Sequence, residues 1–335
     1  MPDPPPVKRN NVTRHYTFID FATQGYLVLV GLLILLLHGH NVPPWRWLLF
    51  AHAVTIALVH LLILSHARWP SNRFLDFFRH FYPVLLYAGF YRETGELNQM
   101  TMTGYLDPHF IRLEDRIFGT QPSLAFMQTL PIRAISEVFY ASYFSYYLMI
   151  GGVGLALFLK DRRQFFHYVS VVSFVFYVCY LIYIFTPVMG PRSFERVIDG
   201  YELPARFQPG ASLEIPEVIQ AGLFFRIMAW IYGTFEAPGA AFPSSHVAVA
   251  LTTMYFSFRY LRPIRFVHLI VAVLLCFSTV YCRYHFAVDV VAGVITAIVL
   301  VPLGNWLYFR FRKPLEEADS RSAARSGGGI QSGRS

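Results

Sequence analysis

The chain has 335 residues, of which 55% are hydrophobic and only 14% are charged. Soluble domains carry about a quarter charged residues, so the composition excludes an ordinary soluble domain and indicates an α-helical membrane protein. The formal net charge of +8 does not indicate nucleic-acid binding, because the basic residues cluster in short loops and tails beside apolar runs. That distribution is typical of topology control and of contact with anionic lipid headgroups.

Apolar runs of membrane-spanning length follow a polar, Pro-rich N-terminus, for which we expect no cleaved signal sequence. The predicted spans are residues 18–37, 45–65, 135–159, 165–187, 245–261, 266–281 and 286–309. Residues 74–91 are a further candidate, whose apolar part is short and contains Asp76, Arg79 and His80. Crossing, re-entrant and interfacial arrangements all stay open for it. The sequence therefore predicts an all-α, polytopic bundle of seven or eight transmembrane spans.

Positively charged segments predict which end of the bundle faces the cytoplasm. The runs KDRR, RYLRPIR and RFRK, at residues 160–163, 259–265 and 310–313, alternate correctly with the spans and are expected to be cytoplasmic. The loop of residues 188–242 and the turn of residues 283–285 then lie on the outer side. Basic residues before the first span also favour the inside, which gives eight spans; with seven spans the N-terminus lies outside.

Four segments are expected along the chain: a polar N-terminal tail (1–16), an N-terminal transmembrane and interfacial region (17–131), a transmembrane core with the ionisable motifs (132–311) and a disordered C-terminal tail (312–335). Residues 100–131 are interpreted as a polar connection, and residues 219–237 as a helix at the membrane interface. The cysteines are expected to be small buried hydrophobic residues: Cys179, Cys276 and Cys282.

Ionisable residues follow or begin three of the spans on the predicted outer side. Arg192 ends the run GPR, His246 ends PSSH, and His285 lies in RYHFAVD with Asp289 four residues later. Residues i and i+4 share one face of a helix. A carboxylate bonded to one imidazole nitrogen leaves the other free as a nucleophile or base. A purely structural His–Asp pair that ties two helices is the equal alternative for this pair alone.

The run PSSH is a good helix start, because Ser244 or Ser245 can cap the helix and the open backbone amides can bind an anion. His246 has no capping role there and can protonate a leaving oxygen. Arg192 and Arg283 can clamp phosphate oxygens. In isolation a cap and a headgroup-binding arginine are the simpler interpretations. Together the residues form a set for phosphoryl transfer, and the sequence shows no metal-binding or Walker-type motif.

These motifs resemble those of the type 2 phosphatidic acid phosphatase superfamily: GPR its first motif, PSSH its second and HFAVD its third. The resemblance covers roughly residues 165–309. It implies a six-helix phosphatase-like core and a metal-independent mechanism through a phosphohistidine, with no cofactor. His285 would attack phosphorus, Asp289 would orient it, and His246 would act as acid and then as base. Arg192, Ser244 and Ser245 would hold the phosphoryl oxygens, with Arg283 as a possible substitute clamp.

Three departures from the family pattern bear on the substrate. Phe185 replaces a lysine seven residues before Arg192. The family pattern has an arginine followed by a proline, whereas here Pro191 precedes Arg192. Thr279 replaces an arginine six residues before His285. Upstream runs, FYPVLLYAGFYRETGELN and FGTQPS, are more similar to the branch of fungal inositol phosphorylceramide synthase and its bacterial relatives. A phosphodiester headgroup carries less charge than a phosphomonoester, so the lost cations agree better with that branch.

The leading hypothesis is therefore a bacterial inner-membrane enzyme, facing the periplasmic or extracellular side, that transfers a lipid headgroup to a lipid alcohol. Hydrolysis of a lipid phosphate or polyprenyl diphosphate is the alternative within the family. A transporter with a His/Asp pathway is the alternative of another class, and a catalytically inactive lipid-binding member is a third. Six acidic residues of the upstream region are candidate polyol ligands: Glu93, Glu96, Asp107, Glu114, Asp115 and Glu137.

Overall fold

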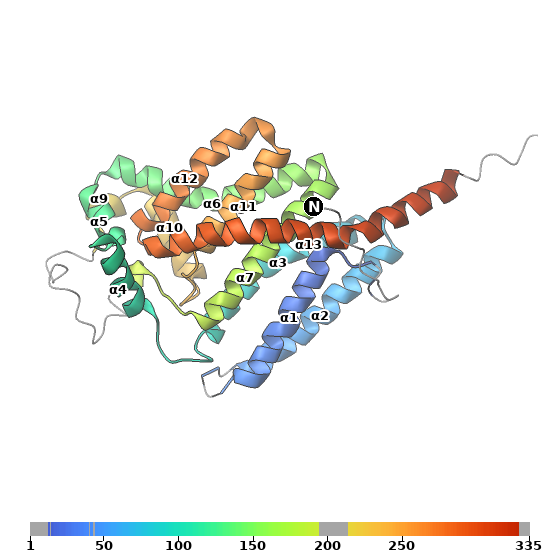
Figure 1. Cartoon of the computed structure of the whole chain (residues 1–335), viewed down its shortest axis with the longest axis horizontal. Coiled ribbons are helices and arrows are strands. Elements are labelled where there is room, and N and C mark those ends of the chain that lie inside the picture. Colours follow the sequence, from blue (N-terminus) through green and yellow to red (C-terminus); the bar gives the residue numbers. More distant parts are fainter. Residues whose placement is uncertain (1–12, 14, 40, 43, 194–213, 328–335) are drawn as a thin grey trace, which may run out of the picture.

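The computed structural model describes residues 13, 15–39, 41–42, 44–193 and 214–327, with side chains up to residue 311. The described chain is a bundle of α-helices without strands (Figure 1). The helices are α1 (Phe18–Leu37), α2 (Trp45–Arg68), α3 (Arg73–Leu97), α4 (Asp107–Phe118), α5 (Pro122–Thr129), α6 (Arg133–Lys160), α7 (Arg162–Phe185), α9 (Glu217–Gln220), α10 (Leu223–Phe235), α11 (Ser245–Tyr260), α12 (Arg265–Tyr281) and α13 (Ala287–Gly327).

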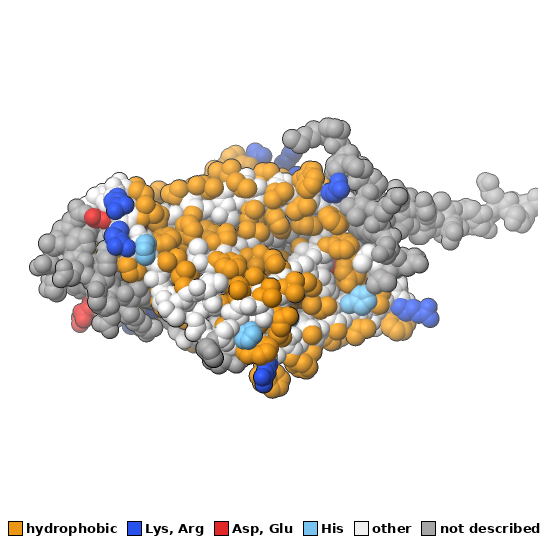
Figure 2. Space-filling model, turned by 60° about the horizontal axis from the view of Figure 1, so that its bottom comes forward, with side chains coloured by type: hydrophobic (Ala, Val, Ile, Leu, Met, Phe, Trp, Pro, Cys, Tyr) orange, Lys and Arg blue, Asp and Glu red, His pale blue; other side chains and the backbone are white. Residues whose placement is uncertain are grey.

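Six helices of the described chain are long and apolar enough to cross a membrane: α1, α2, α6, α7, α12 with its preceding turn, and α13. The chain is thus an integral membrane protein with six candidate spans. Hydrophobic side chains cover the middle of one face of the molecule, and Lys and Arg side chains lie toward its margins (Figure 2). Large exposed residues such as Leu36, Leu58 and Leu159 would be costly in water, and a lipid environment accounts for them.

Helices α3 and α11 were also expected to cross the membrane. Both lie within the bundle, but neither is both long enough and apolar enough to count among the six candidate spans. Helix α11 has 16 residues, which rise only about 24 Å at ~1.5 Å per residue, less than a bilayer core of about 30 Å. Helix α3 has 25 residues, but charged side chains lower its hydropathy. The eight-span arrangement therefore stays a prediction.

The charged side chains of α3 are paired with the neighbouring helices. Arg79 donates to both carboxylate oxygens of Asp20 on α1, at 2.9 and 2.5 Å. His52 on α2 lies 2.6 Å from Glu93, from Nε2 to Oε1. All four side chains are buried, and a buried charge without a partner would be strongly destabilising. These pairs make α1, α2 and α3 one packed unit.

Helix α7 is the centre of the fold. It packs against α1, α3, α6, α11 and α13, and 72% of its most apolar stretch is buried, compared with 17% for α2 at the periphery. Its N-terminus is capped by Asp161, which accepts a hydrogen bond from the amide of Arg163 at 2.8 Å. Through α7, the N-terminal helices are joined to α11 and α13, which carry the histidine motifs.

The three basic segments lie at the same end of the bundle, as the sequence predicts. Lys160 donates to the carbonyl oxygen of Tyr260 at 2.6 Å, and the guanidinium of Arg259 lies 5.6 Å from the ring centre of Phe309. Helices α4, α5 and α9 gather at the other end (Figure 1). The assignment of the basic end to the cytoplasm stays a prediction.

The structure differs from the sequence-based expectation in one connecting region. The supposed polar connection of residues 100–131 contains α4 and α5, and α4 is followed by Gly119 with a φ of 66°. Helix α13 continues to Gly327, and the expected disorder of the tail of residues 312–335 stays a prediction. The predicted interfacial helix of residues 219–237 is confirmed as a helix by α9 and α10.

Candidate functional site

Helices α11 and α13 begin side by side, which brings the second and third motifs together. The amide of Ser244 donates to the carbonyl oxygen of Asp289 at 3.1 Å. A Cβ atom on Gly293 would lie 2.6 Å from the carbonyl oxygen of Ser244, so only glycine allows this close approach. Ser244 also caps α11, because its Oγ accepts a hydrogen bond from the amide of Val247 at 3.3 Å.

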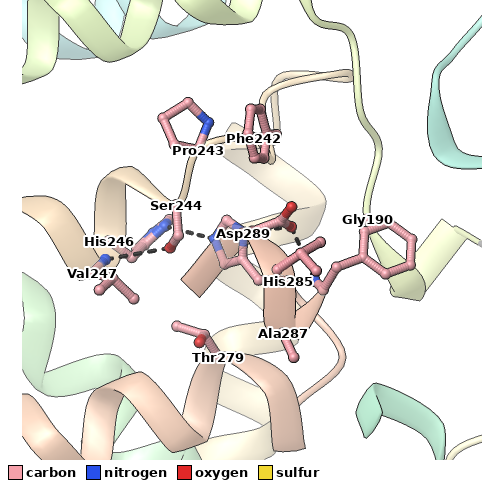
Figure 3. Close-up of polar contacts among 12 residues, drawn as sticks. Gly190, Phe242, Pro243, Ser244, His246, Val247, Thr279, His285, Ala287 and Asp289 are labelled. Carbon is pink, nitrogen blue, oxygen red and sulfur yellow. Dashed lines mark hydrogen bonds and ion pairs between the residues drawn. The ribbon is translucent and has the colours of Figure 1, made fainter. Parts of the chain in front are cut away.

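The two histidines face each other across this junction (Figure 3). Nε2 of His285 lies 3.3 Å from Nδ1 of His246, and Nδ1 of His285 lies 3.4 Å from Oδ2 of Asp289. His285 is 3% exposed and Asp289 is fully buried. Burial lowers the pKa of His285 to about 4, against the opposing effect of a backbone hydrogen bond with Ala241. The imidazole of His285 is therefore neutral at neutral pH, as a nucleophile requires.

Asp289 combines two roles. Its Oδ2 accepts a hydrogen bond from the amide of Phe286 at 2.9 Å, the pattern of a carboxylate in the first turn of a helix. The same oxygen faces His285 at the longer distance of 3.4 Å. This carboxylate stabilises the start of α13 and also lies beside Nδ1 of His285. Whether it orients His285 or serves as a structural tie stays a prediction.

The turn before His285 is built on an unusual backbone. Helix α12 ends in a Schellman motif, in which the amide of Tyr284 bonds the carbonyl oxygen of Thr279 at 3.0 Å and the amide of Arg283 bonds that of Val280 at 3.0 Å. Arg283 holds the left-handed position with a φ of 62°, where glycine is usual. The amide of His285 also bonds the carbonyl oxygen of Thr279, at 3.1 Å. Thr279 therefore fixes the backbone of His285.

Backbone hydrogen bonds hold the segment before the first motif beside the segment before the second. The amide of Val188 donates to the carbonyl oxygen of Gly239, and Val188 accepts from the amide of Ala241. Gly190 has a φ of 90°, and a Cβ atom there would lie 2.7 Å from the carbonyl oxygen of Tyr284. Both oxygens of Asp107 accept amide hydrogen bonds from this loop, from Met189 and Gly190 at 2.9 and 2.8 Å.

The two arginines predicted to bind phosphate, Arg192 and Arg283, lie in different surroundings. Arg192 is exposed, and its guanidinium lies 5.1 and 5.3 Å from the ring centres of Tyr284 and Tyr232. Its Nη1 donates to the hydroxyl of Tyr284 at 3.1 Å. Arg283 is 2% exposed, and burial lowers its pKa while the nearby hydroxyls of Tyr140 and Tyr281 raise it. Its electrostatic neighbours are therefore these tyrosines.

The amides at the start of α11 are partly used within the chain. That of Ser244 bonds Asp289, as described, and that of Ser245 donates to the hydroxyl of Tyr183 at 3.2 Å. Tyr183 in turn donates to the carbonyl oxygen of Pro243 at 3.0 Å. The structure thus joins Ser244 and Ser245 to the histidines, and an anion at this helix start would compete with these bonds for the amides.

Sequence reasoning missed the aromatic side chains around the histidines. The ring centre of His246 lies 4.5 Å from that of Tyr146 and 5.0 Å from that of Tyr143. Tyr143 stacks on Tyr284, which stacks on Tyr232. A continuous series of rings thus links Arg192 to His246. Nothing in the sequence of α6 distinguishes these tyrosines from others, since their role depends on which face of the helix meets α11.

Most of the acidic polyol candidates bind parts of the chain itself. Glu93 pairs with His52 and Asp107 with the first-motif loop, as described above. Glu137 accepts from the amides of Leu223 and Phe224, at 3.0 and 3.2 Å, where α10 begins. Glu114 accepts from the amides of Ala287 and Val288 at the start of α13. Glu96 is exposed and Asp115 is partly buried.

Glu114 binds the start of α13, directly after His285 in the chain. Its Oε1 binds the two amides, while its Oε2 and the Oδ1 of Asp289 are buried without a hydrogen bond in the described part of the chain. Burial, together with the nearby charge of Asp289, raises the pKa of Glu114 to about 8 against the lowering effect of the amide hydrogen bonds. This carboxyl thus holds a proton that an ordinary glutamate has lost.

The proton on Glu114 makes stability depend on pH. Between the usual glutamate pKa of 4.5 and the folded value of about 8, the folded protein binds a proton that the unfolded chain has released. The free energy of unfolding therefore falls as pH rises through this interval. We expect Glu114→Gln to flatten this fall, measured as the unfolding temperature in detergent from pH 5 to 8.5. Glu96→Gln is the matched exposed control, and an equal slope in wild type and Glu114→Gln would contradict the assignment.

Comparison with known proteins gives one family. Residues 109–303, more than half of the chain, match the PAP2 superfamily, that of the type 2 phosphatidic acid phosphatases. No curated protein and no solved structure gave a significant match. The match includes GPR, PSSH and RYHFAVD together with Glu114, and it begins within α4, after α1, α2 and α3. The chain therefore belongs to the PAP2 superfamily.

Proposed function

We propose that the protein transfers the phosphoryl-linked headgroup of a membrane lipid to a lipid alcohol through a phosphohistidine intermediate. The observation that supports it is the alignment of Asp289, His285 and His246 along one line of contacts. Membership in the PAP2 superfamily implies a metal-independent, phosphatase-type enzyme acting on lipid phosphates. Transfer of an inositol phosphate headgroup, as in inositol phosphorylceramide synthases, is the finer part of the proposal.

In the first half-reaction, Nε2 of His285 attacks phosphorus, a P–N bond forms and the P–O bond to the departing lipid alcohol breaks. The electron pair stays on that oxygen, which takes a proton from His246. In the second half-reaction, His246 takes the proton of the acceptor hydroxyl, whose oxygen forms the new P–O bond as the P–N bond breaks. Asp289 orients His285, and a bound phosphoryl group takes the place of the 3.3 Å contact between the rings.

The phosphoryl oxygens need stabilisation by cations and amides. In this proposal Ser244, Ser245 and the first amides of α11 supply part of it. Arg192 supplies charge from across the tyrosine series, and Arg283 acts from the turn before His285. The catalytic core comprises residues 132–311, to which α4 is attached through Glu114. The site faces the periplasmic or extracellular side of a bacterial inner membrane, opposite the basic end.

Two departures from the phosphatase pattern support transfer over hydrolysis. The position of one family arginine is taken by Thr279, whose carbonyl oxygen holds the amide of His285. The position of the family lysine is taken by Phe185, which is 40% exposed at the end of α7. A site that lacks the family lysine, and whose second arginine acts from a different turn, is better matched to a singly charged phosphodiester than to a phosphomonoester.

A labelling experiment distinguishes transfer from hydrolysis. Purified protein in detergent is incubated with phosphatidylinositol that carries ³²P, with and without ceramide or a diacylglycerol whose acyl chains differ from those of the donor. We expect label in a new lipid only when the acceptor alcohol is present. Release of inositol phosphate or free phosphate as the only labelled product would support hydrolysis and overturn the transfer proposal. Phosphatidate and a polyprenyl diphosphate are tested in parallel, because they are the substrates of the alternative.

A further inference from the structure

A cavity of about 400 Å³ lies beside the histidines, between α3, α6, α7, α10 and α11. Its wall is almost entirely apolar or aromatic and includes Tyr146 and Tyr147 of α6 and Tyr180 of α7. Glu236, Ser245 and His246 also line it. A few polar groups on a mostly hydrophobic wall are typical of a small-molecule site.

The cavity gives access to His246 and not to His285. His246 is partly exposed, whereas His285 is 3% exposed and is not part of the wall. Nδ1 of His246 faces His285, and its Nε2 makes no hydrogen bond within the described chain. A group that exchanges a proton with His246 from the cavity is therefore the oxygen of an alcohol, because the phosphorus must lie next to His285.

Helix α3 supplies one wall, although it lies outside the residues that match the family. Val84, Tyr87, Ala88 and Tyr91 line the cavity. The wall is fixed in place: the hydroxyl of Tyr87 bonds Oγ of Ser173 at 2.6 Å. The N-terminal region thus shapes a surface next to the catalytic base, where it can select the substrate.

The cavity opens on the outer surface of the bundle, between α3 and α6. Ala88 of α3 and Gly151 of α6 both line it and are exposed, and a Cβ atom on Gly151 would meet nothing within 4 Å. Both helices bear exposed apolar residues that suit lipid, such as Leu85 and Leu155. A cavity of this volume holds a drug-sized molecule, so a long hydrocarbon chain must continue outside it.

We propose that this cavity binds the long-chain lipid alcohol of the transfer reaction, with the hydroxyl oxygen at His246 and the hydrocarbon leaving past Ala88 and Gly151 into the bilayer. The proposal rests on the proposed function. The departing and the accepting alcohol use the same site in turn, because each exchanges its proton with His246. Helix α3 therefore determines which lipid alcohol is accepted.

Adjacent glycines of α6 provide a matched test. Gly151 and Gly152 are both exposed, and a Cβ atom would meet nothing within 4 Å at either, but only Gly151 lines the cavity. The rate with a long-chain lipid phosphate is divided by the rate with a small aryl phosphodiester that has no chain. We expect Gly151→Leu to lower this ratio by about tenfold or more, the scale of a misfit methyl-sized group in a pocket. Gly152→Leu should leave the ratio unchanged.

A second pair on α3 tests the same opening from the other wall. Ala88→Leu should lower the ratio, whereas Gly89→Leu should not, since only Ala88 lines the cavity. Equal ratios for the members of both pairs would overturn the cavity proposal while leaving the enzyme's activity intact.

A binding measurement separates failure of the cavity from failure of the proposed function. The unfolding temperature is measured with and without dioleoylglycerol in wild type, Gly151→Leu and Gly152→Leu. We expect dioleoylglycerol to stabilise wild type and Gly152→Leu and not Gly151→Leu, as binding to the folded state requires. This pattern in a protein that transfers no phosphoryl group would support the cavity and refute the reaction. Equal stabilisation of all three proteins would refute the cavity.

Discussion

Replacing His285 with alanine is expected to reduce turnover by about 10⁴-fold or more, because removal of a nucleophile also removes the covalent pathway. The buried imidazole of His285 lies between Asp289 and His246. Turnover of ³²P-labelled lipid by the purified variant measures the effect. His109→Ala is the control, since His109 is an exposed histidine on α4.

The same variant tests the intermediate directly. Wild-type protein stopped in alkali during turnover should retain ³²P on the chain, and acid should release it, because the P–N bond of phosphohistidine is labile in acid. His285→Ala should retain none. Label on the His285→Ala protein, or full turnover by it with an unchanged unfolding temperature, would show that another residue is the nucleophile.

Replacing His246 with alanine is expected to lower the rate on an alkyl phosphodiester by about 10²- to 10⁴-fold, the usual contribution of a general acid. The loss should shrink strongly when the leaving group is a nitrophenol, whose oxygen departs without a proton. The partly exposed ring of His246 at the cavity wall gives the physical reason. Kinetics with a series of leaving groups measure the effect.

The leaving-group series also provides the outcome that would contradict this role. If alkyl and nitrophenyl esters lose the same factor in His246→Ala, the residue positions the substrate or His285 and does not donate a proton. His268→Ala serves as the control, because His268 lies on α12, where its Nδ1 bonds Oγ of Ser257 and it is not part of the site.

The sequence predicted the apolar helices well, because membrane spans are set by the length of an uninterrupted apolar run. Helices α1 and α7 agree with the predicted spans within three residues at either end. Helix α4 was missed because its alternating charges suggested a loop. The signals were nevertheless present: Pro108 follows Asp107 at its start, and Gly119 follows its end.

The histidine motifs could be predicted to meet because each begins a helix at the same end of the bundle. The residues that surround the histidines and set their environment could not be predicted from the sequence. Glu114 and Asp107 lie far from the motifs in sequence, and their roles come from backbone amides of α13 and of the first-motif loop. Backbone donors have no signature in a sequence. Tyr143 and Tyr146 were missed for the related reason that the packing of α6 against α11 selects them.

The bond between the amide of Ser244 and the carbonyl oxygen of Asp289 limits how the site can open. It couples the first turn of α11 to that of α13, and Gly293 keeps the backbones in contact. Moving either helix alone would break this junction, whereas the imidazole rings of His246 and His285 can rotate without breaking it. Side-chain rotation is much faster than a domain motion. The candidate site is therefore a rigid backbone frame in which the two imidazole rings are the movable parts.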